Sequence, residues 1–294
     1  STLPYAGFMV KPDPFVEGRV YISGYIRDGS IGKMAMFIST DFGATWTPSI
    51  ADSVGNSYGY CCGVSTVDSG VVYIAGSGGK LYRSTDHAET WELRNSGLGT
   101  AVLYSVSENS ANPDILIAGT TSYGVYRSTD AGLNWARTGM MLRAYYAEFS
   151  AANPAYGYAA YDTVFVTTDS GATWFQPDPG IRQTYAKGFA VHPTEGEVAY
   201  VCGTNGCFRT EDHGTNWAEA HAGMKVSQIS TISVNPEDQN RIYLELYQNG
   251  VYKTADCGET WTRCSDFLSC GNICGIGVEP GADADILYAL EGAG

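Results

Sequence analysis

The sequence predicts an all-β fold, a β-propeller of four-stranded antiparallel blades, from three observations. An eight-residue segment recurs six times at spacings of 39 to 45 residues, which is the length of one propeller blade. The chain has 36 glycines and is 13% aromatic, a composition typical of many short strands joined by tight turns. Alternating apolar strand patterns flank each copy. We therefore expect one propeller domain over residues 1–294.

Each copy of the segment has Asp at its third position and Trp at its eighth. The residues are Asp41, Trp46, Asp86, Trp91, Asp130, Trp135, Asp169, Trp174, Asp212, Trp217, Asp256 and Trp261. An Asp side chain accepts hydrogen bonds from the backbone of its own turn, and Gly two residues later supplies a positive φ. The Trp ring is expected to be buried between neighbouring sheets. These residues therefore serve the fold. Ala88 replaces the Gly in the second copy, which predicts a strained or differently shaped turn.

The strands of one blade can be read around the sixth copy. An inner strand over 229–234 is followed by a proline turn, a second strand over 241–246, a glycine turn, a third strand over 251–253 and the repeated segment. An outer strand then opens at the Trp. Inner strands are predicted at 7–11, 58–66, 102–107, 145–150, 185–191, 229–234 and 273–278.

The seventh repeat contains only two predicted strands. Its second strand covers 285–290, and no third strand or further copy of the segment follows. We expect six complete blades and a partial seventh of a seven-bladed propeller. A longer chain, the N-terminal segment or a strand from a partner would complete the seventh blade. The open edge of this blade could also lead to self-association.

Charge and hydropathy narrow the range of partners. A net charge of -14 with only 17 Lys and Arg argues against nucleic-acid binding over the whole surface, although a local basic patch stays open. There is no apolar run of 18 residues and no N-terminal signal segment, so no transmembrane segment is predicted. Either the chain is cytosolic or a signal peptide has been removed.

The cysteines favour removal of a signal peptide and an extracellular, periplasmic or cell-surface protein. They are Cys61, Cys62, Cys202, Cys207, Cys257, Cys264, Cys270 and Cys274. Their even number predicts disulfides, whereas the absence of Cys-x-x-Cys argues against a metal. No metal or cofactor is expected. Connectivity stays open: Cys202 with Cys207 would bridge a hairpin, Cys257 with Cys264 would staple a turn, and Cys61 could pair with Cys62 or elsewhere.

The repeated segment resembles the Asp box, or bacterial neuraminidase repeat. Sialidases, two-propeller xyloglucanases, sortilins, photosystem II assembly propellers and many secreted proteins carry it, so the resemblance implies architecture more than activity. The Phe-Arg-Ile-Pro-like motif of sialidases is absent, because Phe208 and Arg209 belong to the repeated strand. Xyloglucanases place one catalytic Asp in each of two propellers, and only residues 25–28 are loosely comparable here.

A binding site is expected on the face opposite the Asp boxes, where loops gather around the channel. The candidate ligand-binding residues are Arg27, Tyr58, Tyr60, Tyr123, Arg143, Tyr145, Tyr161, Arg182, Tyr185 and Tyr247. Tyrosine offers a flat apolar face and a polar tip suited to sugar rings or peptides, and Arg27, Arg143 and Arg182 could converge on a carboxylate. The alternative is that these residues are ordinary strand and loop side chains.

Three functions follow. The first is a secreted or cell-surface scaffold that binds a glycan or a protein. The second is a glycoside hydrolase, which needs two carboxyls about 5 to 10 Å apart; the weak catalytic candidates are Asp28, Glu148 and Asp162. The third is a structural subunit of an extracellular assembly. The missing catalytic motifs put binding first.

Overall fold

The computed structural model describes residues 7–140, 142–177, 181, 185–222, 224, 228–238, 240–247, 249–264, 273–279 and 286–291. The chain divides into two compact units, Ser1–Ala147 and Glu148–Gly292. Strands form nearly all of the regular structure, and the described residues contain one short 3-10 helix, Ser77–Gly79. The all-β prediction is confirmed, while the single domain over 1–294 stays a prediction.

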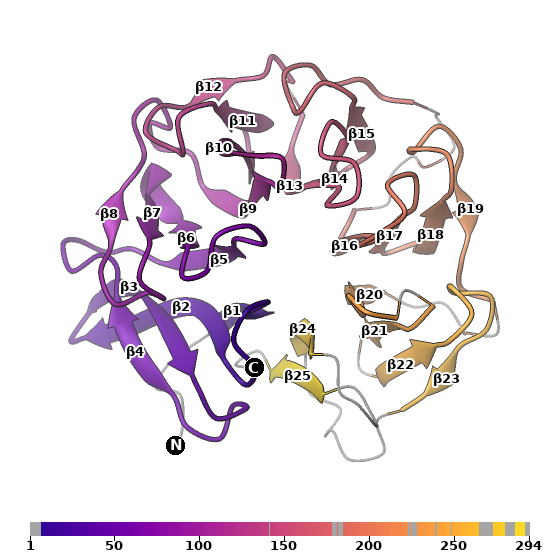
Figure 1. Ribbon diagram of the computed structural model, residues 1–294, viewed down its shortest axis with the longest axis horizontal. Helices are drawn as coiled ribbons and strands as arrows, with labels where there is room; N and C mark the ends of the chain where they lie inside the picture. The colour runs from indigo at the N-terminus through magenta and orange to yellow at the C-terminus, as the bar shows by residue number, and fades with distance from the viewer. Residues whose placement is uncertain are drawn as a thin grey trace. The chain divides into compact units, whose positions relative to one another are not determined.

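The first unit contains three antiparallel sheets whose strands follow one another in chain order (Figure 1). The first sheet is β1 (Gly7–Pro12), β2 (Val20–Asp28), β3 (Ile31–Ser39) and β4 (Thr47–Ile50). The second is β5 (Gly59–Val64), β6 (Val72–Gly76), β7 (Leu81–Ser84) and β8 (Glu92–Leu93). The third is β9 (Leu103–Asn109), β10 (Asn112–Thr120), β11 (Val125–Ser128) and β12 (Ala136–Arg137).

The second unit continues the pattern. A three-stranded sheet holds β13 (Ala144–Phe149), which spans the boundary between the units, β14 (Gly157–Tyr161) and β15 (Val164–Thr167). Two four-stranded sheets follow: β16 (Gly188–Val191), β17 (Ala199–Gly203), β18 (Gly206–Thr210) and β19 (Ala218–Glu219), then β20 (Ile229–Val234), β21 (Ile242–Leu246), β22 (Gly250–Thr254) and β23 (Thr262–Arg263). The last described sheet pairs β24 (Ile273–Glu279) with β25 (Ile286–Glu291). Each predicted inner strand is found.

The fourth blade departs from the prediction because it lacks a four-stranded sheet. Its outer strand is reduced to one bridge between Val166 and Phe175. In other blades the residue three positions after the Trp donates its N–H to the third strand, as Arg94 does to the Leu81 carbonyl at 2.8 Å. The fourth blade has Pro177 at this position, and proline has no N–H to donate. The missing donor ends the strand.

Each Asp box forms the turn between the third and fourth strands. In the third box, the Asp130 carboxylate accepts hydrogen bonds from the Asn134 backbone N–H, the Asn134 side-chain amide and the Ser128 hydroxyl, each at 2.8 Å. The Ser128 oxygen accepts the Gly132 N–H at 2.9 Å. The same arrangement recurs at Asp41, Asp86, Asp169, Asp212 and Asp256. The predicted Asp geometry is thus observed throughout.

The box backbone contains two left-handed residues, one more than the sequence predicted. The Gly two residues after the Asp has a positive φ, and so does the residue directly after the Asp, such as His87 with φ 59°. Ala88 adopts φ 70°, close to the value of 86° at Gly132. The second box therefore keeps the common turn shape, and its alanine carries the strain that a side chain brings to this region.

The Trp rings are less buried than predicted. Trp135 and Trp261 are 5% and 8% exposed, whereas the other four are half-buried. The Trp135 indole N–H still reaches the preceding sheet, donating to the Arg94 carbonyl at 3.0 Å and to the Gly132 carbonyl of its own turn at 2.8 Å. A ring near the rim of a sheet keeps one edge in water while it links neighbouring blades.

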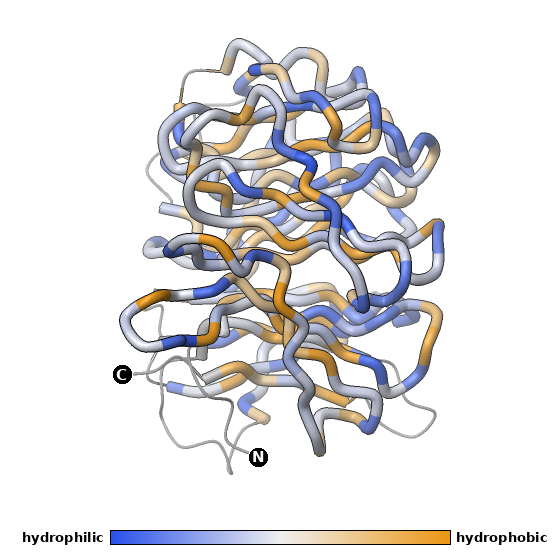
Figure 2. The backbone as a smooth tube through the Cα atoms, turned by 90° about the vertical axis from the view of Figure 1, so that its left-hand side faces the viewer, coloured by the Kyte–Doolittle hydropathy of each residue, from blue (hydrophilic) through white to orange (hydrophobic). Residues whose placement is uncertain are grey.

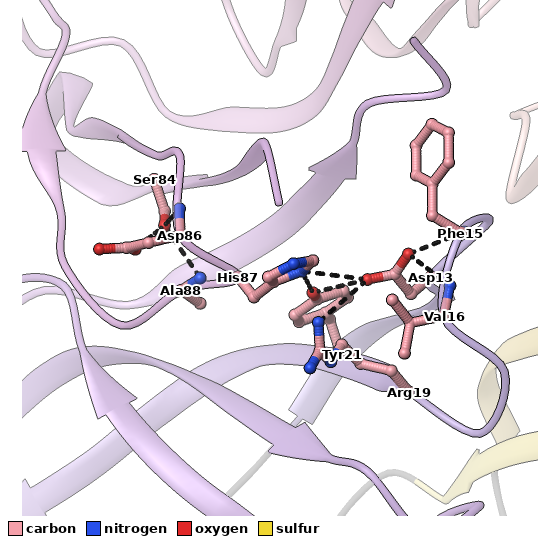
Figure 3. A network of polar contacts seen from close by, with 9 residues as sticks. All are labelled: Asp13, Phe15, Val16, Arg19, Tyr21, Ser84, Asp86, His87 and Ala88. Carbon is pink, nitrogen blue, oxygen red and sulfur yellow. Dashed lines mark hydrogen bonds and ion pairs between the residues drawn. The ribbon is translucent and has the colours of Figure 1, made fainter. Parts of the chain in front are cut away.

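A polar cluster also joins the first two sheets. Asp13, 8% exposed in the turn after β1, accepts hydrogen bonds from the Phe15 backbone N–H and the Tyr21 hydroxyl, both at 2.9 Å. The His87 ring of the second Asp box points toward it, with Nδ1 3.4 Å from the carboxylate and 3.3 Å from the Tyr21 hydroxyl (Figure 3). Burial raises the pKa of Tyr21 above its usual range, so this hydroxyl keeps its proton.

The core lies within and between the sheets. Fully buried Tyr73, Leu81 and Leu103 belong to one cluster that joins the second and third sheets. Fully buried Tyr200 and Leu244 belong to a cluster of the second unit. Figure 2 shows hydrophobic and hydrophilic residues interspersed along the backbone. Most of the largest fully buried side chains belong to strands.

Backbone hydrogen bonds distinguish two sets of loops, which lie at opposite ends of the strands. The Asp boxes bond to the segments joining first and second strands, as in His87 N–H to Gly70 O at 2.9 Å and His213 N–H to Glu197 O at 3.0 Å. The loops between second and third strands bond to the segments entering inner strands, as in Gly79 N–H to Ala101 O at 2.7 Å. We call this second set of loops and segments the loop face. It lies at the ends of the strands opposite the Asp boxes, as predicted.

Candidate functional site

Each of the first three inner strands begins with a β-bulge. The pairing of β1 with β2 skips Phe8, that of β5 with β6 skips Tyr60, and that of β9 with β10 skips Tyr104. A bulged residue leaves the ladder, and bulges often re-aim a side chain. The side chain of the second residue in each inner strand can therefore lie beside the side chain of the second residue in the next inner strand. Tyr145 occupies the corresponding place in β13.

These bulged residues form a continuous row of rings. Tyr60 and Tyr104 stack with centroids 5.1 Å apart and planes 10° apart, and Tyr104 stacks on Tyr145 at 4.8 Å and 21°. Phe8 meets Tyr60 edge-on at 5.0 Å. Tyr25 and Tyr58 are in edge contact at 4.7 Å. They extend the row because Tyr25 contacts Phe8 and Tyr58 contacts Tyr60. We call the six residues Phe8, Tyr25, Tyr58, Tyr60, Tyr104 and Tyr145 the aromatic arc.

The arc offers ring edges more than ring faces. Centroid spacings near 5 Å leave no space for a third ring between stacked neighbours, because aromatic pairs themselves stack at about 4.5 to 7 Å. All six side chains are half-buried. Burial and the neighbouring Tyr104 raise the pKa of Tyr60, so this phenol keeps its proton at neutral pH. The accessible chemistry is therefore that of edges and hydroxyl groups, which both donate and accept hydrogen bonds.

Of the predicted binding residues, Tyr58, Tyr60 and Tyr145 belong to the arc. Tyr123 does not, because the Arg137 guanidinium lies over its ring at 4.3 Å. In the second unit, Tyr161 meets Tyr185 edge-on at 6.2 Å.

The remaining predicted binding residues are not members of the arc. Arg27 lies at the end of β2 and Arg143 just before β13, both exposed. Tyr247 is exposed after β21. Arg182 lies outside the described residues.

Phe8, Tyr25 and Tyr104 are not among the binding residues predicted from the sequence. Phe8 and Tyr104 follow Gly7 and Leu103, just as Tyr60 follows Gly59. An alignment of the inner strands against one another would have shown an aromatic residue at the second position of four successive strands. The bulge that makes this position special is a property of strand pairing, which the sequence did not reveal.

The three candidate carboxylates have different surroundings. Asp28, at the exposed end of β2, is 2.7 Å from the Lys33 ammonium, whose hydrogen bond lowers the pKa of Asp28. A lowered pKa is the opposite of what a glycosidase acid needs. Glu148 lies half-buried in β13 and Asp162 half-buried after β14. Among the described residues, no group of three or more His, Cys, Asp or Glu side chains has an arrangement able to hold a metal.

Glu245, a carboxylate that was not predicted as a site residue, is fully buried in β21. Neither of its oxygens makes a well-aligned hydrogen bond within the described part of the chain, and the buried Ser230 hydroxyl is a polar group beside it. Burial raises the pKa of Glu245, and Ser230 opposes part of that rise. Glu245 pairs in register with Val251, whereas the second sheet has Ala75 opposite Leu81. The carboxylate thus occupies the position that Ala75 holds in the second sheet and Ser23 holds in the first.

The cysteines are distributed over several environments. Cys202 and Cys207 face each other with their sulfur atoms 2.7 Å apart. Cys61 and Cys62 direct their thiols to opposite neighbours, the carbonyls of Ala75 in β6 and Met9 in β1.

The other predicted pair has separate acceptors. The Cys257 thiol donates to the Asn240 side chain at 3.0 Å, and the Cys264 thiol to the Val251 carbonyl at 3.4 Å. Cys270 and the side chain of Cys274 lie outside the described residues.

Comparison with known proteins supports the repeat and the fold. The BNR/Asp-box repeat family matches residues 37–48, and the family described as Sortilin, neurotensin receptor 3 matches residues 162–275. Xyloglucanase Xgh74A of Acetivibrio thermocellus is 27% identical over 158 residues, which cover 43% of this chain and 19% of the relative. The chain thus spans about a fifth of that curated protein's length.

Two solved structures are similar in fold. The GH74 xyloglucanase of Xanthomonas campestris gives a TM-score of 0.67 at 16% identity, covering 85% of this chain and 45% of that one. YCF48 bound to D1 peptide gives a TM-score of 0.71 at 14% identity, covering 98% and 92%. Within the described residues, no helix is long and apolar enough to cross a membrane. By its repeats and by its sheets, this chain is an Asp-box β-propeller.

Proposed function

We propose that this protein is a recognition module that holds an extended peptide segment of a protein partner along the aromatic arc. The observation that carries the proposal is the stacking of Tyr60, Tyr104 and Tyr145 at 4.8 to 5.1 Å. Sugar rings bind to aromatic faces, and the faces that Tyr60, Tyr104 and Tyr145 turn toward one another are covered by the neighbouring ring. A peptide backbone instead offers donors and acceptors in series, which match a row of phenol edges.

Two further points support a peptide ligand. The arc follows successive inner strands through the first unit, so its row of hydroxyl-bearing rings suits a chain better than a compact molecule. The structurally similar YCF48 is described as bound to D1 peptide. A partner protein of this kind, outside the cytosol, agrees with the cysteine content of the sequence.

The test is a binding screen of the full chain against a peptide array and a glycan array. Tyr104→Ala should weaken the best peptide at least tenfold, because it interrupts the stack at its centre. Tyr123→Ala is the matched control, since Tyr123 is an exposed tyrosine of the same unit that lies outside the arc. Peptide binding unchanged by Tyr104→Ala, or binding to glycans alone, would contradict the proposal.

A glycoside hydrolase is the second candidate, favoured by the 27% identity to a xyloglucanase. It predicts release of reducing sugars from xyloglucan, lost in Glu148→Gln or Asp162→Asn. The Asp28 and Lys33 ion pair makes Asp28 the least suitable acid. Hydrolysis by the wild-type chain that survives in the arc variant Tyr104→Ala would favour this candidate over the peptide module.

A further inference from the structure

Two buried cysteines face each other at the end of the hairpin formed by β17 and β18. Cys202 and Cys207 are directly paired in register, and their sulfur atoms lie 2.7 Å apart. Both residues are 0% exposed. A disulfide bond is about 2.05 Å long, so the thiols would need only a small approach to become bonded.

The backbone places this pair where a cross-strand disulfide fits. The Cys202 carbonyl accepts the Lys187 N–H at 2.8 Å, and the Cys207 carbonyl accepts the Ala220 N–H at 2.8 Å. Both carbonyls therefore point away from the strand pair, which makes it a non-hydrogen-bonded pair. The Cα atoms of such pairs are about 4.5 Å apart, within the range of about 4.4 to 6.8 Å that disulfides span.

Packing alone does not require cysteines here. The same register position holds Ala75 opposite Leu81 in the second sheet and Ala160 opposite Val164 in the fourth. Aliphatic pairs thus fill this place in two other blades. Two thiols in contact can be oxidised to a disulfide, which an aliphatic pair cannot form.

We propose that Cys202 and Cys207 form a disulfide that clamps the hairpin of the fifth blade, through exchange with a small-molecule disulfide such as oxidised glutathione. One protein thiolate attacks the glutathione disulfide, forming a mixed disulfide and releasing one glutathione thiolate. The second protein thiolate attacks the mixed disulfide at the protein sulfur, so the protein S–S bond forms and the second glutathione leaves. Two protein thiols are oxidised, one glutathione disulfide is reduced, and the two protons pass to the released thiolates.

The clamp would fix a loop of the loop face. The hairpin turn between Gly203 and Gly206 lies beneath the His221 ring, since a Cβ on Gly206 would come 2.8 Å from that ring. His221 Nδ1 is also 3.0 Å from the Cys207 carbonyl. Burial raises the pKa of Cys202, so the thiolate is scarce in the folded chain and the bond is expected to form during folding.

Tryptic mapping tests the bond directly. The full chain is refolded in reduced and oxidised glutathione, alkylated with iodoacetamide under denaturing, non-reducing conditions, and digested with trypsin. Cleavage after Lys187 and Arg209 yields one peptide, 188–209, which contains both cysteines and no other. The expected peptide carries no alkyl group and is about 2 Da lighter than the reduced form. Recovery of this peptide with both cysteines alkylated would overturn the proposal.

A double variant tests the clamp. Cys202→Ala with Cys207→Leu copies the Ala75 and Leu81 pair of the second sheet, and so it should fold without the thiols. A closed loop of about six residues predicts that dithiothreitol lowers the melting temperature of the oxidised wild-type chain by about 5 °C. The variant should show no such shift. A shift of equal size in the variant would mean that this pair does not clamp the hairpin.

Discussion

Replacing Glu245 by Gln should stabilise the protein near neutral pH. Gln has nearly the shape of Glu and removes only the ability to carry a charge. Glu245 is fully buried, and neither oxygen makes a well-aligned hydrogen bond among the described residues. An unpaired buried polar group costs about 1 to 3 kcal/mol, and more when it is charged. Gln keeps the cost of a buried polar group and removes only the extra cost of the charge, so we expect Glu245→Gln to raise the free energy of unfolding by about 1 kcal/mol at pH 8.

The pH dependence gives the prediction its sign. The pKa of Glu245 in the folded chain is raised from 4.5, so the native state binds the proton more tightly than the unfolded state. The stability that this residue contributes is fully present below pH 4.5 and is lost as the pH rises through the folded pKa. The gain from Glu245→Gln should therefore be large at pH 8 and small near pH 4.

Urea denaturation of both chains from pH 4 to pH 8 measures this difference. Glu259→Gln is the matched control, because Glu259 is an exposed glutamate of the same unit, and its effect should be near zero at every pH. A difference between wild type and Glu245→Gln that stays constant with pH would refute a titrating buried carboxylate. So would a Gln variant that is less stable than wild type at pH 8.

Three further predictions concern the first unit. Hydrogen bonds from Thr90 and Ser84 lower the pKa of Asp86 to about 2. The stability that the Asp86 carboxylate gives the second box is therefore present above pH 3.8 and should be lost as the pH falls through about 2. An NMR titration of the Asp86 carboxyl group measures this pKa. Trp135→Phe should cost about 2 kcal/mol, because it removes a buried indole N–H that donates twice; a urea midpoint equal to wild type would contradict the role of Trp135 between the blades. Lys80→Met should cost about 3 kcal/mol, because Asp52, 4% exposed, would lose its paired cation; most of this loss should be absent when Asp52→Asn is already present, as a double-mutant cycle can measure.

The local features of the fold were predictable from the sequence. The Asp box is a local motif, since each Asp bonds to residues two and four positions away, and such a turn depends on its own residues. The spacing of the boxes then fixes the strands between them, because one blade needs about 40 residues. Pro177 was equally readable, as a residue that cannot donate to the third strand.

The candidate site depended on tertiary structure. The arc exists because strands distant in sequence, β1, β5 and β9, bulge at equivalent residues, and register between strands is a long-range property. Tyr60 and Tyr104 stack on their neighbours, so they offer their ring edges to a ligand. The sequence had suggested that flat tyrosine faces would bind it. Likewise, Glu245 reads as an ordinary strand residue until its neighbours are known. The sequence by itself determined the turns, the strands and their order, because these follow from local backbone chemistry, and only the packing of the strands decided which side chains meet.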